Sequence, residues 1–568
     1  LDSCFEKVYV KRKYVLIHSG SPAVYQLKPK KDNIGSLTRM TLGEKNPNKT
    51  ILLVGETGTG KSTLINALVN YAMGVEWEDD VWFKIIEEEK RSQSESQTSD
   101  VIVYQIFGFE DKTLPYSLTI IDTPGYGSTR GIGQDVIISQ RLFDLFRSED
   151  GVHEINAVGL VVTGTVNRLS DRQRYIFDSV ISLFGKDIEK NIVALITHSD
   201  GITPKNALQA LEAAKIKCAR NEKNQPVHFL FNNRQEEDRT EDEEALKHAD
   251  KTSMKRMNQF TNFLVKTPPQ KMQKTVDVLN ERIRLTACIQ NLQERIELIY
   301  LKQTEIQQTQ DGLKKHEEEM KKNENFTIEV DEVYKDKEPI DGGMWGLVFY
   351  EAATCCTVCE ENCHYPGCTM AWKPGHCEVM KGGHCTSCTR KCPASDHVKE
   401  NWKYVDKTRK VKKTLEDVKE KYETNKKETK NKESLLETLQ KEKETLEEKK
   451  TPLLDEAYQH VVKLEQIALN VVSLSTYVHL DFLIEEMTKK KDTEKVDHLK
   501  QMESQKDEGF LAGLQYMYNA ISQMFKRKKM TRGLPRSRLL TQRHVPVSWS
   551  YSCSSLEQGE HLDHRRKI

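Results

Sequence analysis

The sequence lacks an excess of charge of either sign. Its 568 residues contain 86 Lys+Arg and 86 Asp+Glu, so the formal net charge is +0. No overall electrostatic field therefore attracts the chain to nucleic acid or repels it from a membrane. We expect no nucleic-acid partner, and any charge-driven binding has to come from local patches.

Long apolar runs are missing as well. No stretch approaches the roughly 20 apolar residues that a membrane-spanning helix needs. The first residues, which begin with Leu1, also lack the charged and then apolar pattern of a signal peptide. We therefore expect a cytoplasmic protein, with association at a membrane surface as the alternative. Because the chain begins at Leu1 rather than at Met, we also expect it to be a fragment of a longer one.

What the sequence does contain changes along its length. Between about Thr50 and Phe231, short apolar runs alternate with amphipathic helical stretches. The apolar runs are TILLV at Thr50, VIVYQI at Val101, SLTII at Ser117, INAVGLVV at Ile155, NIVALIT at Asn191 and VHFLF at Val227. This alternation predicts a doubly wound α/β fold in which helices cover a mostly parallel sheet.

After Pro269 the apolar residues follow a heptad-like spacing. A first seam runs through Leu285, Ile289, Leu292, Ile296, Ile299, Ile306 and Leu313. A second seam runs through Val411, Leu415, Val418, Tyr422, Leu436, Leu439, Leu446 and Leu453, among many Lys and Glu residues. Such seams are typical of coiled coils. Because the two helical stretches have similar lengths, we predict an antiparallel coiled-coil hairpin with residues 326–397 at its tip.

A glycine-rich turn stands between the first predicted strand and a helix. Its sequence, VGETGTGKST, fits the pattern G-x-x-x-x-G-K-[ST] in the context that a phosphate-binding loop requires. The candidate phosphate-binding residues are Gly55, Glu56, Thr57, Gly58, Thr59, Gly60, Lys61, Ser62 and Thr63. In this interpretation backbone N–H groups surround the phosphates, Lys61 reaches the β and γ oxygens and Ser62 ligates Mg²⁺.

A second motif, LTIIDTPG, follows an apolar strand. It places Asp122 where a carboxylate reaches the Mg²⁺ shell and Gly125 where a backbone N–H senses a γ-phosphate. Upstream, Thr98 is the candidate switch threonine that closes over Mg²⁺, with Thr57, Thr59 and several nearby serines as alternatives.

The sequence ITHSD after a later strand predicts the base. The carboxylate of Asp200 can accept hydrogen bonds from N1 and N2 of guanine, whereas adenine would leave it without donors. Thr197 and His198 precede it, and Asn232 or Asn233 in FNNR is expected to contact the guanine O6. The expected ligands are therefore GTP and GDP.

In this order and spacing, residues 55–62, Thr98 and the sequences DTPG, THSD and FNNR resemble the G domain of the immunity-associated GTPases and their septin relatives. The resemblance covers about Thr50 to Arg234. It implies a P-loop GTPase fold, homodimers paired through their nucleotide faces, and scaffolding at membranes or on filaments. One departure is that Thr197 is followed by His198, where a more basic residue is usual.

Hydrolysis is expected to be slow. The residue directly after Gly125 is Tyr126, which cannot orient water as a glutamine does in Ras-like GTPases. We therefore expect a partner, such as a second G domain, to supply Arg130 or Arg168 as a charge-stabilising residue. The expected catalytic residues are Lys61, Thr98 and Arg130.

The cysteine-rich segment predicts a second site. Two C-x-x-C pairs lie within a short Gly/Pro-containing stretch, a spacing that lets two thiolates bind one tetrahedral ion. The candidate zinc ligands are Cys356, Cys359, Cys363, Cys385, Cys388 and Cys392. A disulfide network is the alternative, although it suits a secreted module better.

Near the C-terminus an apolar helical stripe precedes the basic cluster KRKK. The stripe consists of Phe510, Leu511, Leu514, Met517, Tyr518, Ile521, Met524 and Phe525. It can bind an anionic membrane or a protein partner, or pack on its own chain. A mechanochemical membrane GTPase is thus the alternative function. A zinc-hook ATPase is a weaker one, because Asp122 precedes the hairpin and no Ser-Gly-Gly signature follows it.

The full domain prediction is an N-terminal extension (1–48), a G domain (49–267), coiled-coil arms (270–325 and 398–451), a cysteine-rich tip (326–397), a C-terminal helical region (453–529) and a disordered tail (530–568). The predicted function is a GTP-binding scaffold or switch, controlled by pairing of its G domains.

Overall fold

The structure is a computed structural model that divides the chain into two compact units. The residues it describes are 14–34, 37–42, 48–87, 100–107, 113–124, 133–240, 242–323, 326–340, 344–345, 349–350, 352–368, 373–414, 416–418, 420, 435–448, 450–471 and 474–504. Within them, the first unit contains the chain up to Leu279, Ile467–Ser475 and residues 502–504, and the second contains Asn280–Gln466 and Thr476–Gln501.

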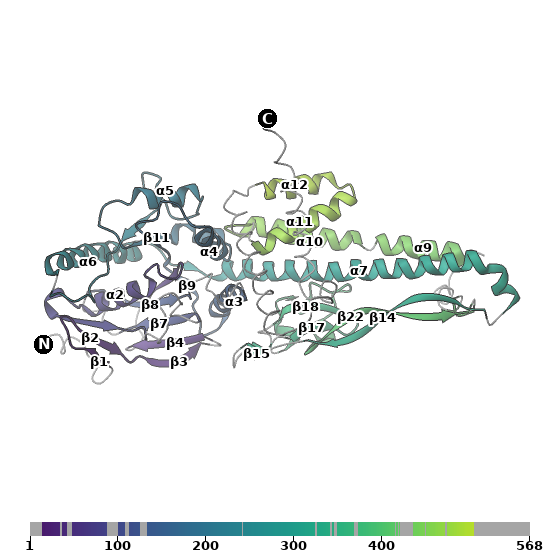
Figure 1. Ribbon diagram of the computed structural model, residues 1–568, viewed down its shortest axis with the longest axis horizontal. Helices are drawn as coiled ribbons and strands as arrows, with labels where there is room; N and C mark the ends of the chain where they lie inside the picture. The colour runs from purple at the N-terminus through teal and green to yellow at the C-terminus, as the bar shows by residue number, and fades with distance from the viewer. Residues whose placement is uncertain are drawn as a thin grey trace, which may run out of the picture. The chain divides into compact units, whose positions relative to one another are not determined.

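A large sheet organises the first unit (Figure 1). Within the described residues it has eight strands in the order β12, β11, β10, β5, β8, β7, β4, β3. Their bounds are β3 (Lys30–Ile34), β4 (Leu37–Leu42), β5 (Asn48–Val54), β7 (Ile102–Ile106), β8 (Ser117–Asp122), β10 (Ala157–Thr163), β11 (Ile192–Thr197) and β12 (His228–Leu230). The pairs β7–β8 and β3–β4 are antiparallel, and the other five neighbours are parallel. The predicted mostly parallel α/β sheet is confirmed.

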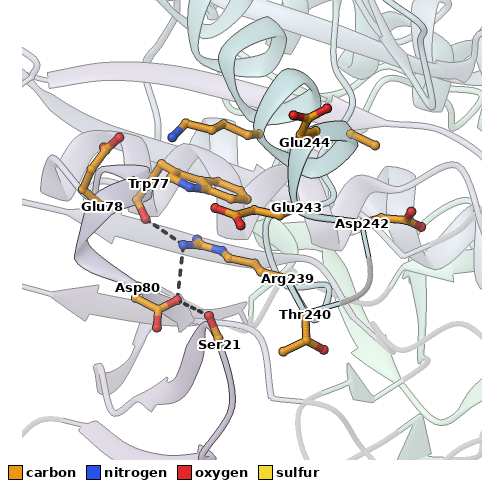
Figure 2. Close-up of a pocket in the computed structure, with 11 residues that line it drawn as sticks. Ser21, Trp77, Glu78, Asp80, Arg239, Thr240, Asp242, Glu243 and Glu244 are labelled. Atoms are coloured by element: carbon orange, nitrogen blue, oxygen red, sulfur yellow. Dashed lines mark hydrogen bonds and ion pairs between the residues drawn. The ribbon is translucent and has the colours of Figure 1, made fainter.

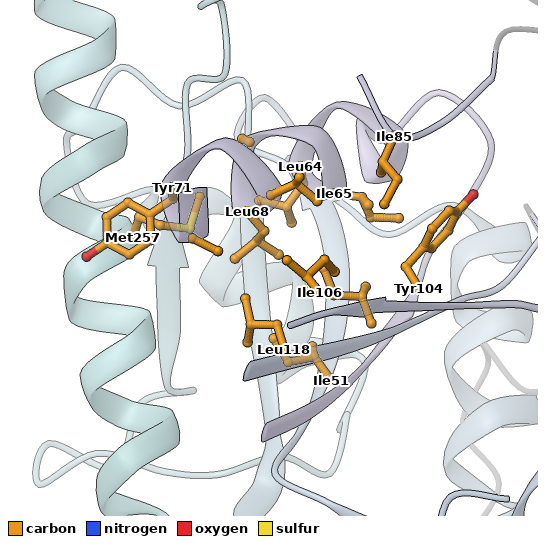
Figure 3. Close-up of a cluster of buried hydrophobic side chains, with 14 of the residues drawn as sticks. Ile51, Leu64, Ile65, Leu68, Tyr71, Ile85, Tyr104, Ile106, Leu118 and Met257 are labelled. Carbon is orange, nitrogen blue, oxygen red and sulfur yellow. The ribbon is translucent and has the colours of Figure 1, made fainter. Parts of the chain in front are cut away.

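One face of this sheet is covered by α2 (Lys61–Met73) and α6 (Glu243–Lys266). Ile51 of β5 and Leu118 of β8 belong to the same buried cluster as Leu68 of α2 and Met257 of α6 (Figure 3). Side chains alternate between the two faces of a strand, so Leu52, which follows Ile51, belongs to the opposite face. It is buried there, outside this cluster. Burial of both faces explains why the strands are continuous apolar runs in the sequence.

Smaller elements complete the first unit. The helices α3 (Gly133–Arg147), α4 (Asp171–Ile181) and α5 (Lys205–Ala213) follow strands of the large sheet. A three-stranded sheet contains β1 (Tyr14–His18), β2 (Ala23–Leu27) and β6 (Val81–Lys84), and β9 (Glu154–Ile155) pairs with β13 (Gln270–Lys271). The chain also returns here after the helical region, since the Leu469 N–H donates to the Phe184 carbonyl at 2.9 Å. The sequence analysis did not predict that return.

The second unit is built on α7 (Gln273–Lys322) and α9 (Leu435–Glu448). Ile299, Ile306 and Leu313 of α7 share a buried cluster with Leu439 and Leu446 of α9. These five residues belong to the two predicted seams, so those parts of the seams do meet. The clustered residues explain the heptad spacing there.

The structure differs from the predicted second helical arm over its first part. Residues Trp402–Lys413 form strand β22, which pairs antiparallel with β14 (Ile328–Pro339) along its whole length. Oppositely charged side chains face each other across the two strands, as in the 2.7 Å pair of Lys407 and Asp336. The Lys-rich stretch is therefore one strand of a charged ribbon, in which cross-strand ion pairs and alternation of side chains replace the helical period.

The ribbon also changes the expected place of the cysteine-rich segment. Contacts with α7 move back along the helix as the chain proceeds: Asp331 bonds Gln308, Glu361 pairs with Arg295, and Arg284 donates to the Glu378 carbonyl. The segment therefore lies beside the body of α7 rather than at the far end of a hairpin (Figure 1). The ribbon folds back because its buried residues share the apolar cluster on α7.

Three further helices follow α9. They are α10 (Lys450–Ile467), α11 (Leu474–Lys489) and α12 (Thr493–Glu503). Among the residues placed by the structure, no helix combines the length and apolarity needed to span a membrane.

Candidate functional site

The glycine-rich turn joins β5 to α2 and needs glycine at three positions. Gly58 and Gly60 have φ of +85° and +82°, a conformation that residues with a Cβ rarely adopt. A Cβ on Gly55 would lie 2.6 Å from the Val161 carbonyl oxygen of β10. The turn thus leaves the first N–H groups of α2 without intrahelical partners, as a phosphate-binding loop requires.

Lys61, the first residue of α2, folds back over this turn. Its Nζ donates to the carbonyls of Gly55 at 2.8 Å and Glu56 at 3.0 Å. Burial lowers the pKa of Lys61 to about 8, while the carboxylates of Asp122 and Glu56 oppose this shift. The ammonium group of Lys61 is thus held at the glycine-rich turn. The next two residues are Ser62, which is half-buried, and Thr63, which is exposed.

Asp122 is fully buried at the end of β8, opposite Leu53 of β5. The next residue, Thr123, donates its hydroxyl to the Leu53 carbonyl at 2.8 Å, which joins the two strand ends. Since β5 and β8 are parallel, the glycine-rich turn and this carboxylate meet at one edge of the sheet. The predicted residues Thr98, Gly125 and Arg130 lie outside the described residues.

The predicted base-reading loop follows β11 at the same edge. Thr197 donates its hydroxyl to the Thr59 carbonyl at 2.7 Å, which connects this loop directly to the glycine-rich turn. His198 adopts a φ of +49°. The exposed Asp200 accepts a hydrogen bond from the Ile202 N–H at 2.9 Å. The structure therefore brings the two predicted motifs together through a hydrogen bond from a side chain to the backbone.

The second predicted base contact lies next to this loop. The Ser199 N–H donates to the Phe231 carbonyl at 3.0 Å, and the Asn232 N–H donates to the Ser253 hydroxyl at 2.9 Å. The buried Asn233 Oδ1 has no hydrogen-bond partner within the described part of the chain. Asn233 thus offers an unsatisfied hydrogen-bond acceptor in this loop.

One residue beside the loop was missed by the sequence analysis. Arg172, at the start of α4, forms a 3.2 Å ion pair with Glu56 of the glycine-rich turn. The predicted Arg168 lies just before this helix and is exposed. No sequence signal distinguished Arg172, because it falls outside every motif and only the packing of α4 brings it to the turn.

The residues present fit a nucleoside triphosphate with Mg²⁺. The left-handed Gly58 has no atom within 4 Å of an added Cβ, so the turn is open there. The Thr57 hydroxyl is buried and has no hydrogen-bond partner among the described residues. An open cradle with an unsatisfied hydroxyl, a lysine and a buried carboxylate is a donor set suited to phosphate and magnesium.

A separate pocket in this unit lies away from the glycine-rich turn. It has a volume of about 920 Å³ and is lined by residues that include Trp77, Asp80 and Arg239 (Figure 2). The Arg239 guanidinium lies 3.7 Å from the centre of the Trp77 ring and donates to the Trp77 carbonyl at 2.6 Å. The guanidinium of Arg239 is therefore already bound to Trp77, and this pocket shares no lining residue with the glycine-rich turn.

The predicted zinc ligands converge in the second unit. Ligand atoms of Cys356, Cys359, Cys388 and Cys392 all lie within 4.8 Å of one another. Those of Cys363, Cys385, Cys388 and His397 form a second such group, and His364, Cys377 and Glu378 form a third. All the cysteines in the first two groups, and Cys377 in the third, are free thiols. His397 was not among the predicted ligands, because only the fold brings it to the sulfurs.

The predicted membrane-binding stripe at 510–525 and the KRKK cluster lie outside the described residues. So does Tyr126, the residue that replaces the water-orienting glutamine.

Comparison with known proteins gives a match to one family model and to solved structures of low similarity. Toc33 from Arabidopsis thaliana in complex with GDP and Mg²⁺ matches with 15% identity over 39% of this chain and 86% of its own, at a TM-score of 0.26. Toc33 from Arabidopsis thaliana in complex with Mg²⁺ and GMPPNP matches with 16% identity over 39% of this chain and 85% of its own, at a TM-score of 0.27. No curated protein sequence matches the chain. The model of the AIG1 family matches residues 49–259. This part of the chain is an AIG1 family domain, of the immunity-associated GTPase type.

Proposed function

We propose that the AIG1 family domain binds GTP and GDP with Mg²⁺ and hydrolyses GTP slowly or with the help of a partner. One observation carries the proposal: the 2.7 Å hydrogen bond from Thr197 to Thr59 couples the base-reading loop to the glycine-rich turn. A phosphate site and a guanine site built in this way suit the two ends of one nucleotide.

The phosphates would lie against the N–H groups of the turn and the N-terminus of α2. Lys61 would exchange its hydrogen bonds to the Gly55 and Glu56 carbonyls for bonds to phosphate oxygens. Ser62, Thr98 and Asp122 would hold Mg²⁺. When bound, Mg²⁺ neutralises phosphate charge and orients the oxygens.

Guanine selectivity would come from Asp200. The carboxylate is exposed in the structure and bonds only locally, to the Ile202 N–H. It is therefore available to accept from guanine N1 and N2, which adenine could not offer together. Asn232 or Asn233 would donate to O6.

Hydrolysis would need help from outside the site. Tyr126 replaces the residue that orients water in faster GTPases, so the intrinsic rate is expected to be low. Arg168 is exposed just before α4, so a nucleotide site on a second copy could be reached by it. Arg130 is the other candidate for this charge-stabilising role.

In this proposal the nucleotide state controls homodimerisation through the G domains. The chain then acts as a scaffold or switch, because the second unit is carried by α7, which begins directly after the G domain. The cysteine-rich segment would hold zinc through Cys356, Cys359, Cys363, Cys385, Cys388 and Cys392 and present a folded surface to protein partners.

Nucleotide binding tests the proposal directly. Titration of the purified chain with fluorescent GTP, GDP and ATP in Mg²⁺ should give tight binding of both guanine nucleotides and weak binding of ATP. Lys61→Ala should lose binding, whereas Lys215→Ala, at an exposed loop lysine, should not. Preference for ATP would contradict the proposal.

Pairing is tested by single-turnover hydrolysis at several protein concentrations. The rate constant should rise with concentration and fall in Arg130→Ala or Arg168→Ala. A fast rate that is independent of concentration would contradict the requirement for a partner.

A further inference from the structure

One sulfur in the cysteine-rich segment belongs to two groups of potential metal ligands. Cys388 Sγ lies within 4.8 Å of the sulfurs of Cys356, Cys359 and Cys392. It also lies within 4.8 Å of the ligand atoms of Cys363, Cys385 and His397. Each group offers four ligands, the number that a tetrahedral zinc ion requires, only if Cys388 is counted in both.

The spacing of the sulfurs fits a shared ion better than a disulfide bond. Two sulfurs bound to one tetrahedral zinc by bonds of about 2.3 Å lie roughly 3.8 Å apart. Cys359 and Cys392 have a separation of 3.7 Å between their Sγ atoms. A disulfide would require about 2.05 Å.

Backbone N–H groups point at the sulfurs in both C-x-x-C turns. The Cys359 N–H donates to Cys356 Sγ at 3.3 Å, and the Cys388 N–H donates to Cys385 Sγ at 3.3 Å. The Cys392 N–H in turn donates to Cys388 Sγ at 3.2 Å. Such bonds are strongest when the sulfur carries negative charge, which is the form that binds metal.

His397 completes the second group with its ring held in place. Its Nδ1 lies 2.9 Å from the Pro393 carbonyl, which requires the proton to be on that nitrogen. The lone pair is then on Nε2, which is buried and has no hydrogen-bond partner within the described residues. A histidine that donates through one nitrogen and faces a ligand cluster with the other is the usual arrangement of a metal-bound imidazole.

We propose that the cysteine-rich segment holds a binuclear zinc centre in which the Cys388 thiolate bridges both ions. One ion is bound by Cys356, Cys359, Cys392 and the bridge. The other is bound by Cys363, Cys385, His397 and the bridge. This inference rests on the zinc binding proposed above and adds the shared sulfur, the histidine ligand and the number of ions.

The centre fixes the segment against α7. The Ser387 carbonyl, one residue before the bridge, accepts a hydrogen bond from Arg295 at 2.8 Å. Ala287 of α7 packs in the same buried cluster as the ligands. Asn291 donates to the Asn362 carbonyl at 3.0 Å, next to Cys363. Because the ions would hold the ligand loops together, they would also stabilise the face of the cysteine-rich segment that contacts α7.

Cys355 provides a matched control. It is a fully buried cysteine directly before Cys356, but it belongs to a different cluster, with Ala353 and Tyr404. Its replacement removes a buried thiol from the same strand without removing a proposed ligand. The separate group of His364, Cys377 and Glu378 shares no ligand with the pair, so an ion there would add to a zinc count without sharing a sulfur with either ion.

X-ray absorption at the zinc edge of the full purified chain tests the bridge. We expect scattering from sulfur at about 2.3 Å and a zinc–zinc distance of about 3 to 4 Å, because two such bonds meet at one sulfur. The zinc–zinc scattering should persist in Cys355→Ala and disappear in Cys388→Ala. Zinc that is bound with sulfur scattering but without a zinc–zinc distance overturns the bridge while leaving zinc binding intact.

Metal content gives an independent measurement. After exposure to a limiting chelator, Cys359→Ala should retain one zinc fewer than the unaltered chain, and Cys388→Ala two fewer. Equal losses in the two variants would overturn the bridge. Absence of zinc, bound iron in its place, or six missing thiols on titration of the denatured chain would overturn the zinc proposal as well. The measurements on the unaltered chain do not depend on how well the variants fold.

Discussion

The hydroxyl of Thr197 lies 2.7 Å from the carbonyl oxygen of Thr59 and donates to it. Thr197 ends a strand whose loop carries the candidate base-reading aspartate, and Thr59 lies in the glycine-rich turn. The bond is buried and links residues 138 positions apart in the sequence. It sets the distance between the two parts of the proposed nucleotide site.

Thr197→Val should therefore weaken GTP binding. Loss of the hydroxyl leaves the Thr59 carbonyl without this donor, at a cost of about 1.4 kcal/mol, or roughly tenfold in Kd. Thr197→Ser should bind almost normally. Thr165→Val, which removes an exposed hydroxyl from the loop after β10, serves as the control. Equal affinities for all four proteins in a fluorescence titration would contradict the coupling.

Asp200→Asn should change base selectivity more than overall folding. An amide can donate to the extra oxygen of xanthine, so the variant should lose GTP affinity by roughly tenfold or more and gain affinity for xanthosine triphosphate. Asp150→Asn, at an exposed aspartate on another loop, should leave both affinities unchanged. The comparison requires Kd values for both nucleotides. A loss of both ligands would indicate a structural rather than a base-reading role.

The buried pair of Glu305 on α7 and Lys413 on β22 should couple the ribbon to the helix. The two charged atoms lie 3.1 Å apart, and the side chains are only 4% and 8% exposed. Lys413→Met leaves Glu305 buried without this cation and should cost about 3 kcal/mol of unfolding free energy. The double variant Glu305→Leu with Lys413→Met should recover much of that loss.

The exposed pair of Lys410 and Glu329 on the same ribbon is the control, because solvent screens it and Lys410→Met should leave the unfolding free energy almost unchanged. Denaturant unfolding followed by circular dichroism compares these three variants with the unaltered chain. If Lys410→Met and Lys413→Met were equally destabilising, burial of the inner pair would not matter.

His479 of α11 should make the second unit sensitive to acid. Burial lowers the pKa of His479 to about 4, from an ordinary value of 6.5. The unfolded chain therefore binds a proton before the folded chain does. The associated stability is fully present above pH 6.5, is lost as the pH falls toward 4, and amounts to about 3 kcal/mol.

His479→Gln should flatten this part of the pH profile, while keeping a side chain able to bond the Thr286 hydroxyl that lies 3.2 Å from the histidine. His384→Gln, at an exposed histidine, is the control. Thermal unfolding between pH 4 and 7 gives the result. An unchanged slope in His479→Gln would show that other groups cause the acid sensitivity.

The α/β sheet could be predicted because both faces of its strands are buried. Each strand then appears as a local apolar run, as in TILLV at Thr50, and each helix between strands as a local periodic stretch. The glycine-rich turn was equally local, since Gly58 and Gly60 follow from the backbone of a single loop.

The charged ribbon could not be predicted in the same way. Residues 402–413 contain the charges and spacings of a solvated helix, and their strand conformation depends on pairing with residues 328–339. That partner lies more than 60 positions away for every pair, and cross-strand contacts of this kind leave little local trace. The return of Leu469 to the first unit is likewise a long-range contact.

The family resemblance, the strands of the sheet and the residue types at both candidate sites could be inferred from local patterns in the sequence, because backbone geometry and burial impose those patterns. Three relationships became visible only in three dimensions: the Thr197 hydroxyl bonds the Thr59 carbonyl, Arg172 pairs with Glu56, and Cys388 lies near two groups of potential ligands. These relationships join residues distant in the chain, and close packing in three dimensions selects them.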